Sequence, residues 1–200
     1  MNLVSSAPAM TRTAIDYDPF AGGALTRVVP TTESQREVWL ADRLGRDASL
    51  AFNESVSLRL RGQLDPQALH HALHTLLERH DALRASFGPD GETFCVRELG
   101  EIAMPLIDLA ALPATERDAA LHAHLQSAVQ MPFVLEHDPL FRAALLRLSS
   151  DEHLLMLTAH HIVCDGWSWW LIVHELGQMY AQNREAAAVP ALPAPEAFAD

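Results

Sequence analysis

Residues 152–170 read EHLLMLTAHHIVCDGWSWW, and the fold is best worked out from this stretch. Its first part, EHLLMLTA, is a short apolar run of the kind that forms a buried strand. After Gly166, apolar residues recur at near-helical spacing, which predicts a helix. His160, His161 and Asp165 therefore stand at a predicted strand-to-helix junction. Such a junction lies at the edge of a sheet, where a neutral imidazole can reach a reacting proton, so chemistry is the first hypothesis.

The pattern His-His-x-x-x-Asp-Gly at residues 160–166 is followed by Trp167 and Ser168. Together these residues resemble the core motif of condensation domains from nonribosomal peptide synthetases, which belong to the chloramphenicol acetyltransferase-like acyltransferases. Epimerisation domains share the seven-residue pattern, and the tryptophan after the glycine favours condensation.

Two further stretches support the resemblance. Residues 79–87, RHDALRASF, begin with Arg79 and are similar to the family's Arg-His-Glu-x-Leu-Arg-Thr-x-Phe motif, with Asp81 in place of Glu. Residues 32–40, TESQREVWL, are similar to its first-helix motif. A complete condensation domain has two lobes that face each other across a tunnel, and these motifs belong to the first. We therefore expect an arm or linker at residues 1–30, the N-terminal lobe at 31–182, and an Ala/Pro-rich linker or the start of the inter-lobe connection at 183–200.

The resemblance implies a role for each motif residue. His161 faces the tunnel and acts on the attacking amine, while His160 packs beneath it and holds the loop. Asp165 forms a structural ion pair with Arg84. Gly166 permits close backbone approach or a positive φ, and its N–H helps to stabilise an oxyanion.

The implied reaction is amide formation between a carrier-bound acyl or peptidyl thioester and a carrier-bound aminoacyl acceptor. The expected partners are the donor and acceptor carrier proteins and the C-terminal lobe of the same domain. Substrates arrive on the phosphopantetheine of the carriers, so the lobe needs no cofactor of its own. Two alternatives remain: a stand-alone, trimeric chloramphenicol acetyltransferase-like enzyme that uses acyl-CoA, and a noncatalytic carrier-docking remnant.

Composition excludes several other classes of protein. The net charge of −12, from 14 Lys+Arg against 26 Asp+Glu, disfavours nucleic-acid binding, which needs a basic patch. No apolar run approaches the length of a membrane span, and the start of the chain lacks a signal-peptide pattern. Cys95 and Cys164 lack metal or redox spacing, so we expect a cytoplasmic protein in which Cys164 is a small core residue.

Other residues favour structural interpretations. His70 and His74 have helical i, i+4 spacing, but no cysteine or carboxylate completes a metal-ligand set. The tryptophans at the start of the last helix are expected in the core, as is usual for an apolar helix. They are Trp167, Trp169 and Trp170.

Helices and strands are expected to alternate along the chain. The predicted helices are 32–44, 65–79, 114–131 and one after residue 166; the predicted strands are 55–61, 83–87, 93–97, 140–148 and 152–159. No Gly-rich phosphate loop follows a strand, so the order predicts a two-layer α/β sandwich with a mixed or antiparallel sheet, not a doubly wound fold. The resemblance implies the same lobe, chloramphenicol acetyltransferase-like.

Overall fold

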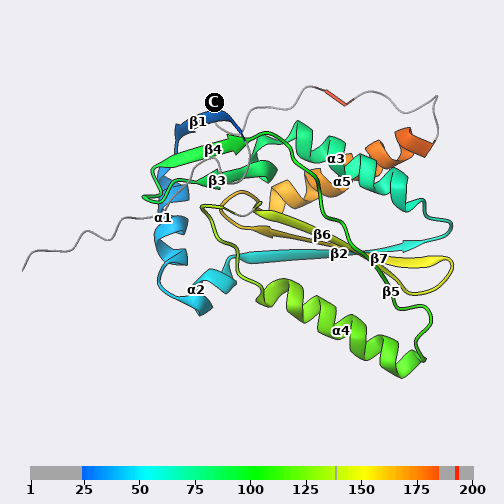
Figure 1. Cartoon of the computed structure of the whole chain (residues 1–200). Coiled ribbons are helices and arrows are strands. Elements are labelled where there is room, and N and C mark those ends of the chain that lie inside the picture. The colour runs from blue at the N-terminus through cyan, green and yellow to red at the C-terminus, as the bar shows by residue number, and fades with distance from the viewer. Residues whose placement is uncertain (1–23, 138, 185–191, 194–200) are drawn as a thin grey trace, which may run out of the picture.

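The computed structural model describes residues 24–137, 139–184 and 192–193 (Figure 1). The helices are α1 Glu33–Asp42, α2 Arg46–Ala51, α3 Pro66–Arg79, η1 Asp81–Arg84 (a 3₁₀ turn), α4 Ala114–Gln130 and α5 Gly166–Arg184. The strands are β1 Leu25–Pro30, β2 Asn53–Arg61, β3 Ala85–Phe87, β4 Thr93–Arg97, β5 Leu106–Asp108, β6 Phe141–Arg147 and β7 Glu152–His160. The predicted strand-to-helix junction is confirmed, since β7 ends at His160 and α5 begins at Gly166.

The larger sheet has the strand order β2-β7-β6-β5 and carries the two motif histidines at the end of β7. β7 pairs antiparallel with both β2 and β6, and β5 pairs parallel with β6, so the sheet is mixed. Helices α3 and α5 cover one face, and α4 lies against the other (Figure 1). The mixed α/β class is confirmed, and α4 adds a layer on the second face. Because helices cover both faces, nearly every residue of β7 is buried.

The smaller sheet, in the order β1-β4-β3, was only partly predicted. The hairpin of β3 and β4 is confirmed, whereas β1 was missed and treated as part of an N-terminal arm. β1 pairs antiparallel with β4, so the folded lobe begins before residue 31. Within the expected linker 183–200, helix α5 continues to Arg184, and residues 185–191 and 194–200 lie outside the described part.

Local sequence signals place the first helices correctly. Thr32 and Gln35 form a reciprocal capping box at the start of α1, and the Asp65 side chain accepts hydrogen bonds from two backbone N–H groups at the start of α3. Arg84 was expected to enter the β3 strand, but it ends the 3₁₀ turn η1 instead. The short elements α2 and β5 were not predicted.

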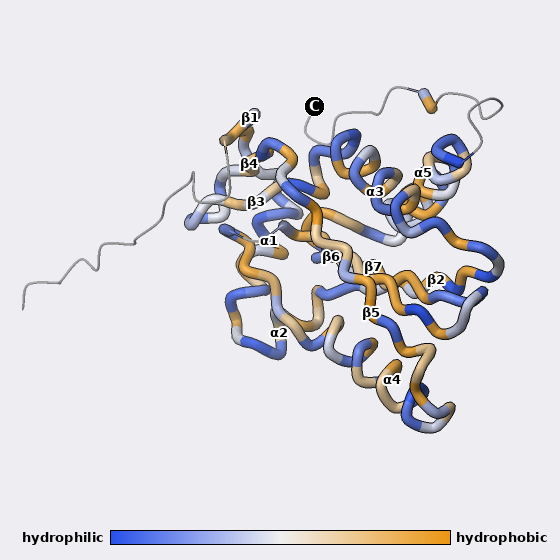
Figure 2. Tube along the Cα trace, turned by 45° about the vertical axis from the view of Figure 1, so that its right-hand side comes forward, coloured by the Kyte–Doolittle hydropathy of each residue, from blue (hydrophilic) through white to orange (hydrophobic). Residues whose placement is uncertain are grey.

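The core divides into two apolar clusters, one on each face of the larger sheet. Apolar segments of β6 and β7 run together between the helices (Figure 2). Leu121 and Leu125 of α4 pack against the smaller cluster, whereas Val129, near the end of the same helix, is 38% exposed. Within the described residues, no helix combines the length and the apolar character needed to cross a membrane.

Candidate active site

His160 is a completely buried histidine whose two ring nitrogens are both engaged. Its side chain is 0% exposed, and its Nδ1 accepts a hydrogen bond from the backbone N–H of Ile162 at 3.1 Å. Because Nδ1 is the acceptor, the proton of the neutral ring lies on Nε2, which is 3.3 Å from Asp42 Oδ1 at the end of α1. Burial lowers the pKa of His160 below its ordinary value, although Asp42 opposes the shift. His160 is therefore a neutral residue that ties the loop to α1.

His161, the next residue, has the opposite arrangement. Its side chain is 43% exposed, and its Nδ1 is 2.6 Å from Glu54 Oε1, at the start of β2. Its backbone N–H donates to the carbonyl of Phe52 at 2.8 Å, and the Phe52 ring stacks on the imidazole with centroids 6.4 Å apart. No hydrogen-bond partner of Nε2 lies among the described residues. Of the two motif histidines, only His161 presents a free ring nitrogen at the surface.

Asp165 and Gly166 occupy the turn between His161 and α5. Asp165 Oδ1 accepts from the backbone N–H of Ser168 at 2.8 Å and from its hydroxyl at 2.7 Å, as a helix-capping side chain does. These hydrogen bonds hold the pKa of the Asp165 carboxyl below its ordinary value. Gly166 is the first residue of α5; its φ is not positive, and a Cβ there would meet nothing within 4 Å. Of the two expectations for this glycine, a positive φ is therefore not realised.

The expected ion pair between Asp165 and Arg84 is also absent. Arg84 forms an ion pair with Asp81, three residues before it in the chain. It also donates a hydrogen bond to the backbone carbonyl of Arg97. The 3₁₀ turn directs Arg84 toward the smaller sheet, whereas Asp165 is satisfied by Ser168 within its own turn. The sequence did not reveal that Arg84 pairs with Asp81 or that Asp165 binds Ser168.

Arg79, the first residue of the same motif, does join two elements of the lobe. Its Nε is 3.0 Å from Oε2 of Glu175 on α5, and Nε2 of His80 lies 2.6 Å from the same oxygen. The Glu175 side chain is only 5% exposed, so this cluster is a buried link between α3 and α5.

The tryptophans of α5 were predicted to lie in the core, and this holds for only one of them. Trp169 is 8% exposed and donates from Nε1 to Glu54 Oε2 at 2.8 Å. Trp167 and Trp170 are 82% and 62% exposed, because they flank the buried stripe of the helix.

Cys164 next to the motif histidines and His70 on α3 were the other candidates for chemistry, and the structure favours neither. Cys164 is buried, as predicted, and burial raises the pKa of its thiol to about 12, which makes it a poor nucleophile. His70 binds the backbone carbonyl of Ile102 through Nε2 at 2.9 Å. Across the described part of the chain, no group of three or more His, Cys, Asp or Glu side chains is arranged to hold a metal ion.

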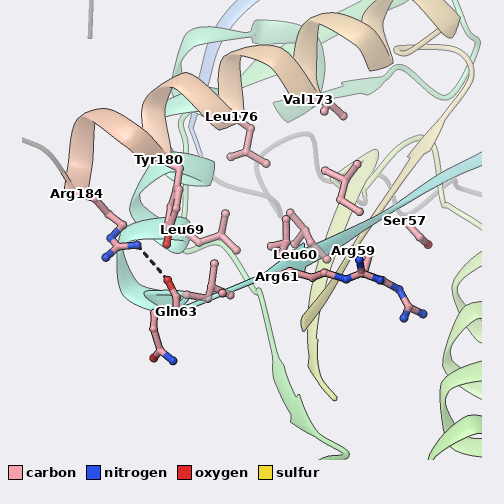
Figure 3. A pocket seen from close by; sticks show the side chains of 15 residues that line it. Ser57, Arg59, Leu60, Arg61, Gln63, Leu69, Val173, Leu176, Tyr180 and Arg184 are labelled. Atoms are coloured by element: carbon pink, nitrogen blue, oxygen red, sulfur yellow. Dashed lines mark hydrogen bonds between the residues drawn. The ribbon is translucent and has the colours of Figure 1, made fainter. Parts of the chain in front are cut away.

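A pocket of about 600 Å³ lies between β2, α3 and α5 (Figure 3). Its apolar wall includes Leu69, Leu176 and Tyr180, and Arg184 at its end donates to the Gln63 carbonyl at 3.0 Å. The pocket follows the second half of β2, and neither motif histidine lines it. The histidines lie beside the other end of β2, so the surface around His161 is a separate site.

Glu54, which contacts His161, was not predicted from the sequence. It belongs to none of the three motifs and lies 107 residues from His161 in the chain. The antiparallel pairing of β2 with β7 sets Glu54 opposite Ala159, close to the histidines. The available signal was the predicted strand at residues 55–61, whose partner the sequence did not identify.

Known proteins resemble this chain over most of its length. A family model described as "Condensation domain" matches residues 26–200. Chondramide synthase cmdD of Chondromyces crocatus is 35% identical over 175 residues, which is 86% of this chain and 4% of that protein. Phosphinothricin tripeptide synthetase PhsC of Streptomyces viridochromogenes is 38% identical over 179 residues, which is 86% of this chain and 16% of that protein.

Solved structures agree with these matches. The starter condensation domain of rhizomide synthetase RzmA aligns with a TM-score of 0.74 and 26% identity, over 82% of this chain and 41% of that one. A chain in the complex of the X-domain and OxyB from teicoplanin biosynthesis aligns with a TM-score of 0.74 and 30% identity, over 88% of this chain and 38% of that one. This chain therefore spans only part of each of these relatives. It belongs to the condensation domain family of nonribosomal peptide synthetases.

Proposed function

We propose that this chain is the N-terminal, donor-side lobe of a condensation domain that joins a carrier-bound acyl or peptidyl thioester to a carrier-bound aminoacyl acceptor. The contrast between the two histidines carries the proposal. His160 is buried with both nitrogens engaged, whereas His161 is exposed with Nε2 free of partners in the described part of the chain. Only a free nitrogen can accept a proton from a substrate. The aligned part of this chain covers 41% and 38% of the two solved relatives, which supports the assignment to one of two lobes.

In the proposed reaction the acceptor amine attacks the thioester carbonyl, a C–N bond forms and the C–S bond breaks. Nε2 of His161 holds the amine by a hydrogen bond and receives the proton that the nitrogen loses. The imidazolium then gives this proton to the leaving thiolate, which restores the neutral ring. Asp165 caps α5 and orients the first turn of that helix next to the loop. The N–H of Gly166 then serves the oxyanion of the tetrahedral intermediate. Donor and acceptor carriers and a second lobe are the partners, and phosphopantetheine carries the substrates.

The test uses a protein that contains this lobe together with a second condensation lobe and two loaded carriers. His161→Ala should abolish amide formation while both carriers still load, since a positioned proton acceptor contributes roughly 10²–10⁴-fold to a rate. His71→Ala is the matched control, because His71 is an exposed histidine on α3 outside the site. Amide formation at the wild-type rate by His161→Ala would overturn the proposal and favour the noncatalytic remnant.

The mass of this chain in solution distinguishes the proposed condensation lobe from a stand-alone, trimeric acyltransferase. Light scattering should give a monomer for this chain, whereas a stable trimer that turns over acyl-CoA would replace the proposed function with the alternative.

A further inference from the structure

Glu54 lies beside the exposed histidine with both of its carboxylate oxygens engaged. Oε1 is 2.6 Å from Nδ1 of His161, and Oε2 accepts from Nε1 of Trp169 at 2.8 Å. A carboxylate only accepts hydrogen bonds, so the neutral imidazole must carry its proton on Nδ1. The lone pair is then on Nε2, the nitrogen that no described residue contacts.

The surroundings fix this pair in one geometry. Trp169 is buried and holds the carboxylate from α5, while Phe52 stacks on the imidazole and accepts the backbone N–H of His161. The β2–β7 register sets Glu54 opposite Ala159, and a shift of one residue would turn the Glu54 side chain to the other face of the sheet. The carboxylate is therefore positioned by a strand, a helix and an aromatic ring together.

We propose that Glu54 is a positioning residue that fixes the tautomer of His161 and stabilises the imidazolium formed when Nε2 takes up a proton. This inference rests on the proposed role of His161 in condensation. A carboxylate on one imidazole nitrogen makes the other a stronger proton acceptor and holds the ring in its reactive orientation. Glu54 itself exchanges no proton with the substrate.

Glu54→Gln is a sharp test because an amide has one acceptor oxygen where the carboxylate has two. Trp169 can only donate and is buried, so it should take the Gln oxygen. The amide NH₂ would then face Nδ1 of His161, which must become an acceptor and move its proton to Nε2. Adding Trp169→Phe frees the oxygen again, and the double variant should regain part of the Nδ1–H form.

The tautomer is measured on the full chain by ¹⁵N NMR of the imidazole nitrogens, assigned with His161→Ala. Wild type should show Nδ1–H and an unprotonated Nε2, and Glu54→Gln should show mainly Nε2–H. Glu152→Gln is the control, because Glu152 is a similarly exposed glutamate (28% against 31%) on the same sheet, paired with Arg59. A merely structural role for Glu54 would not move the tautomer. A wild-type His161 with its proton on Nε2 would overturn the inference.

Kinetics in the two-lobed protein give the second readout. Glu54→Gln should lower kcat at least about tenfold with little change in KM for the carriers, since a general base contributes about 10²–10⁴-fold. A wild-type kcat together with an unchanged tautomer would refute the role of Glu54, even where His161→Ala is inactive. If His161→Ala keeps the wild-type rate, the proposed function fails instead, and the tautomer measurement still reports on the Glu54 contact.

Discussion

Replacing Asp165 tests whether this motif residue acts through the cap seen in the structure or through an ion pair with Arg84. Asp165 is exposed, and its carboxylate accepts two hydrogen bonds from Ser168 at 2.7 and 2.8 Å. Loss of such a helix cap costs about 0.5–2 kcal/mol of the free energy of unfolding. Breaking a buried ion pair would cost about 3–5 kcal/mol, because it leaves an unpaired charge. We expect the smaller value for Asp165→Ala.

Asp165→Asn should keep most of the stability, because an amide oxygen also caps a helix. The two variants should also differ from wild type in their response to acid. Hydrogen bonding holds the pKa of Asp165 below its ordinary 3.8, so the unfolded chain takes up the proton first as the pH falls. The stabilisation by the charged form is present above that value and is lost as the pH falls through the folded pKa. Asp165→Asn should lack this loss.

The measurement is urea unfolding of the full chain, followed by a double-mutant cycle with Arg84→Met. Arg84 pairs with Asp81 and not with Asp165, so the two changes should be additive within about 0.3–0.5 kcal/mol. Arg84→Met with Asp81→Asn is the positive control, since these two side chains do contact each other. A coupling energy above about 1 kcal/mol between Asp165 and Arg84, or a loss of about 3 kcal/mol in Asp165→Ala, would refute the reasoning.

Three further outcomes follow from buried groups. Glu175→Ala should cost about 3–5 kcal/mol of unfolding free energy, because Arg79, 15% exposed, loses its carboxylate partner and keeps, among the described residues, only the Pro193 carbonyl. The same change at the more exposed Glu152 should cost under about 1 kcal/mol, and equal losses in urea titrations would contradict this. Burial raises the pKa of the Cys164 thiol to about 12. This thiol should therefore react with iodoacetamide more than about tenfold slower in the folded chain than in urea, and equal rates would place it at the surface. Burial lowers the pKa of His160 and His153 below 6.5, so the unfolded chain takes up protons first and stability should fall as the pH drops below that value; a midpoint of unfolding that rises between about pH 7 and 5.5 would exclude the effect.

Local sequence signals were sufficient for most elements of the lobe. The capping box at Thr32, the Asp65-Pro66 start of α3 and the alternation along β2 each depend on residues within a few positions of one another. The adjacent histidines, with an apolar strand before them and an apolar helix after them, were enough to predict that both lie at a strand-to-helix junction. The strand β1 escaped prediction because no sustained apolar period marks it; its alternating burial depends on pairing with β4, far along the chain.

The sequence by itself determined the strand-to-helix junction, the family motif and the two histidines, because these are properties of neighbouring residues. Tertiary structure alone decided which histidine is free and which partner each charged group takes. Antiparallel pairing brings Glu54 to His161 across 107 residues, and the path of α5 buries Trp169 while leaving Trp167 exposed. The physical reason is that hydrogen bonds and ion pairs depend on register and helix rotation, which are set by packing between segments distant in the chain.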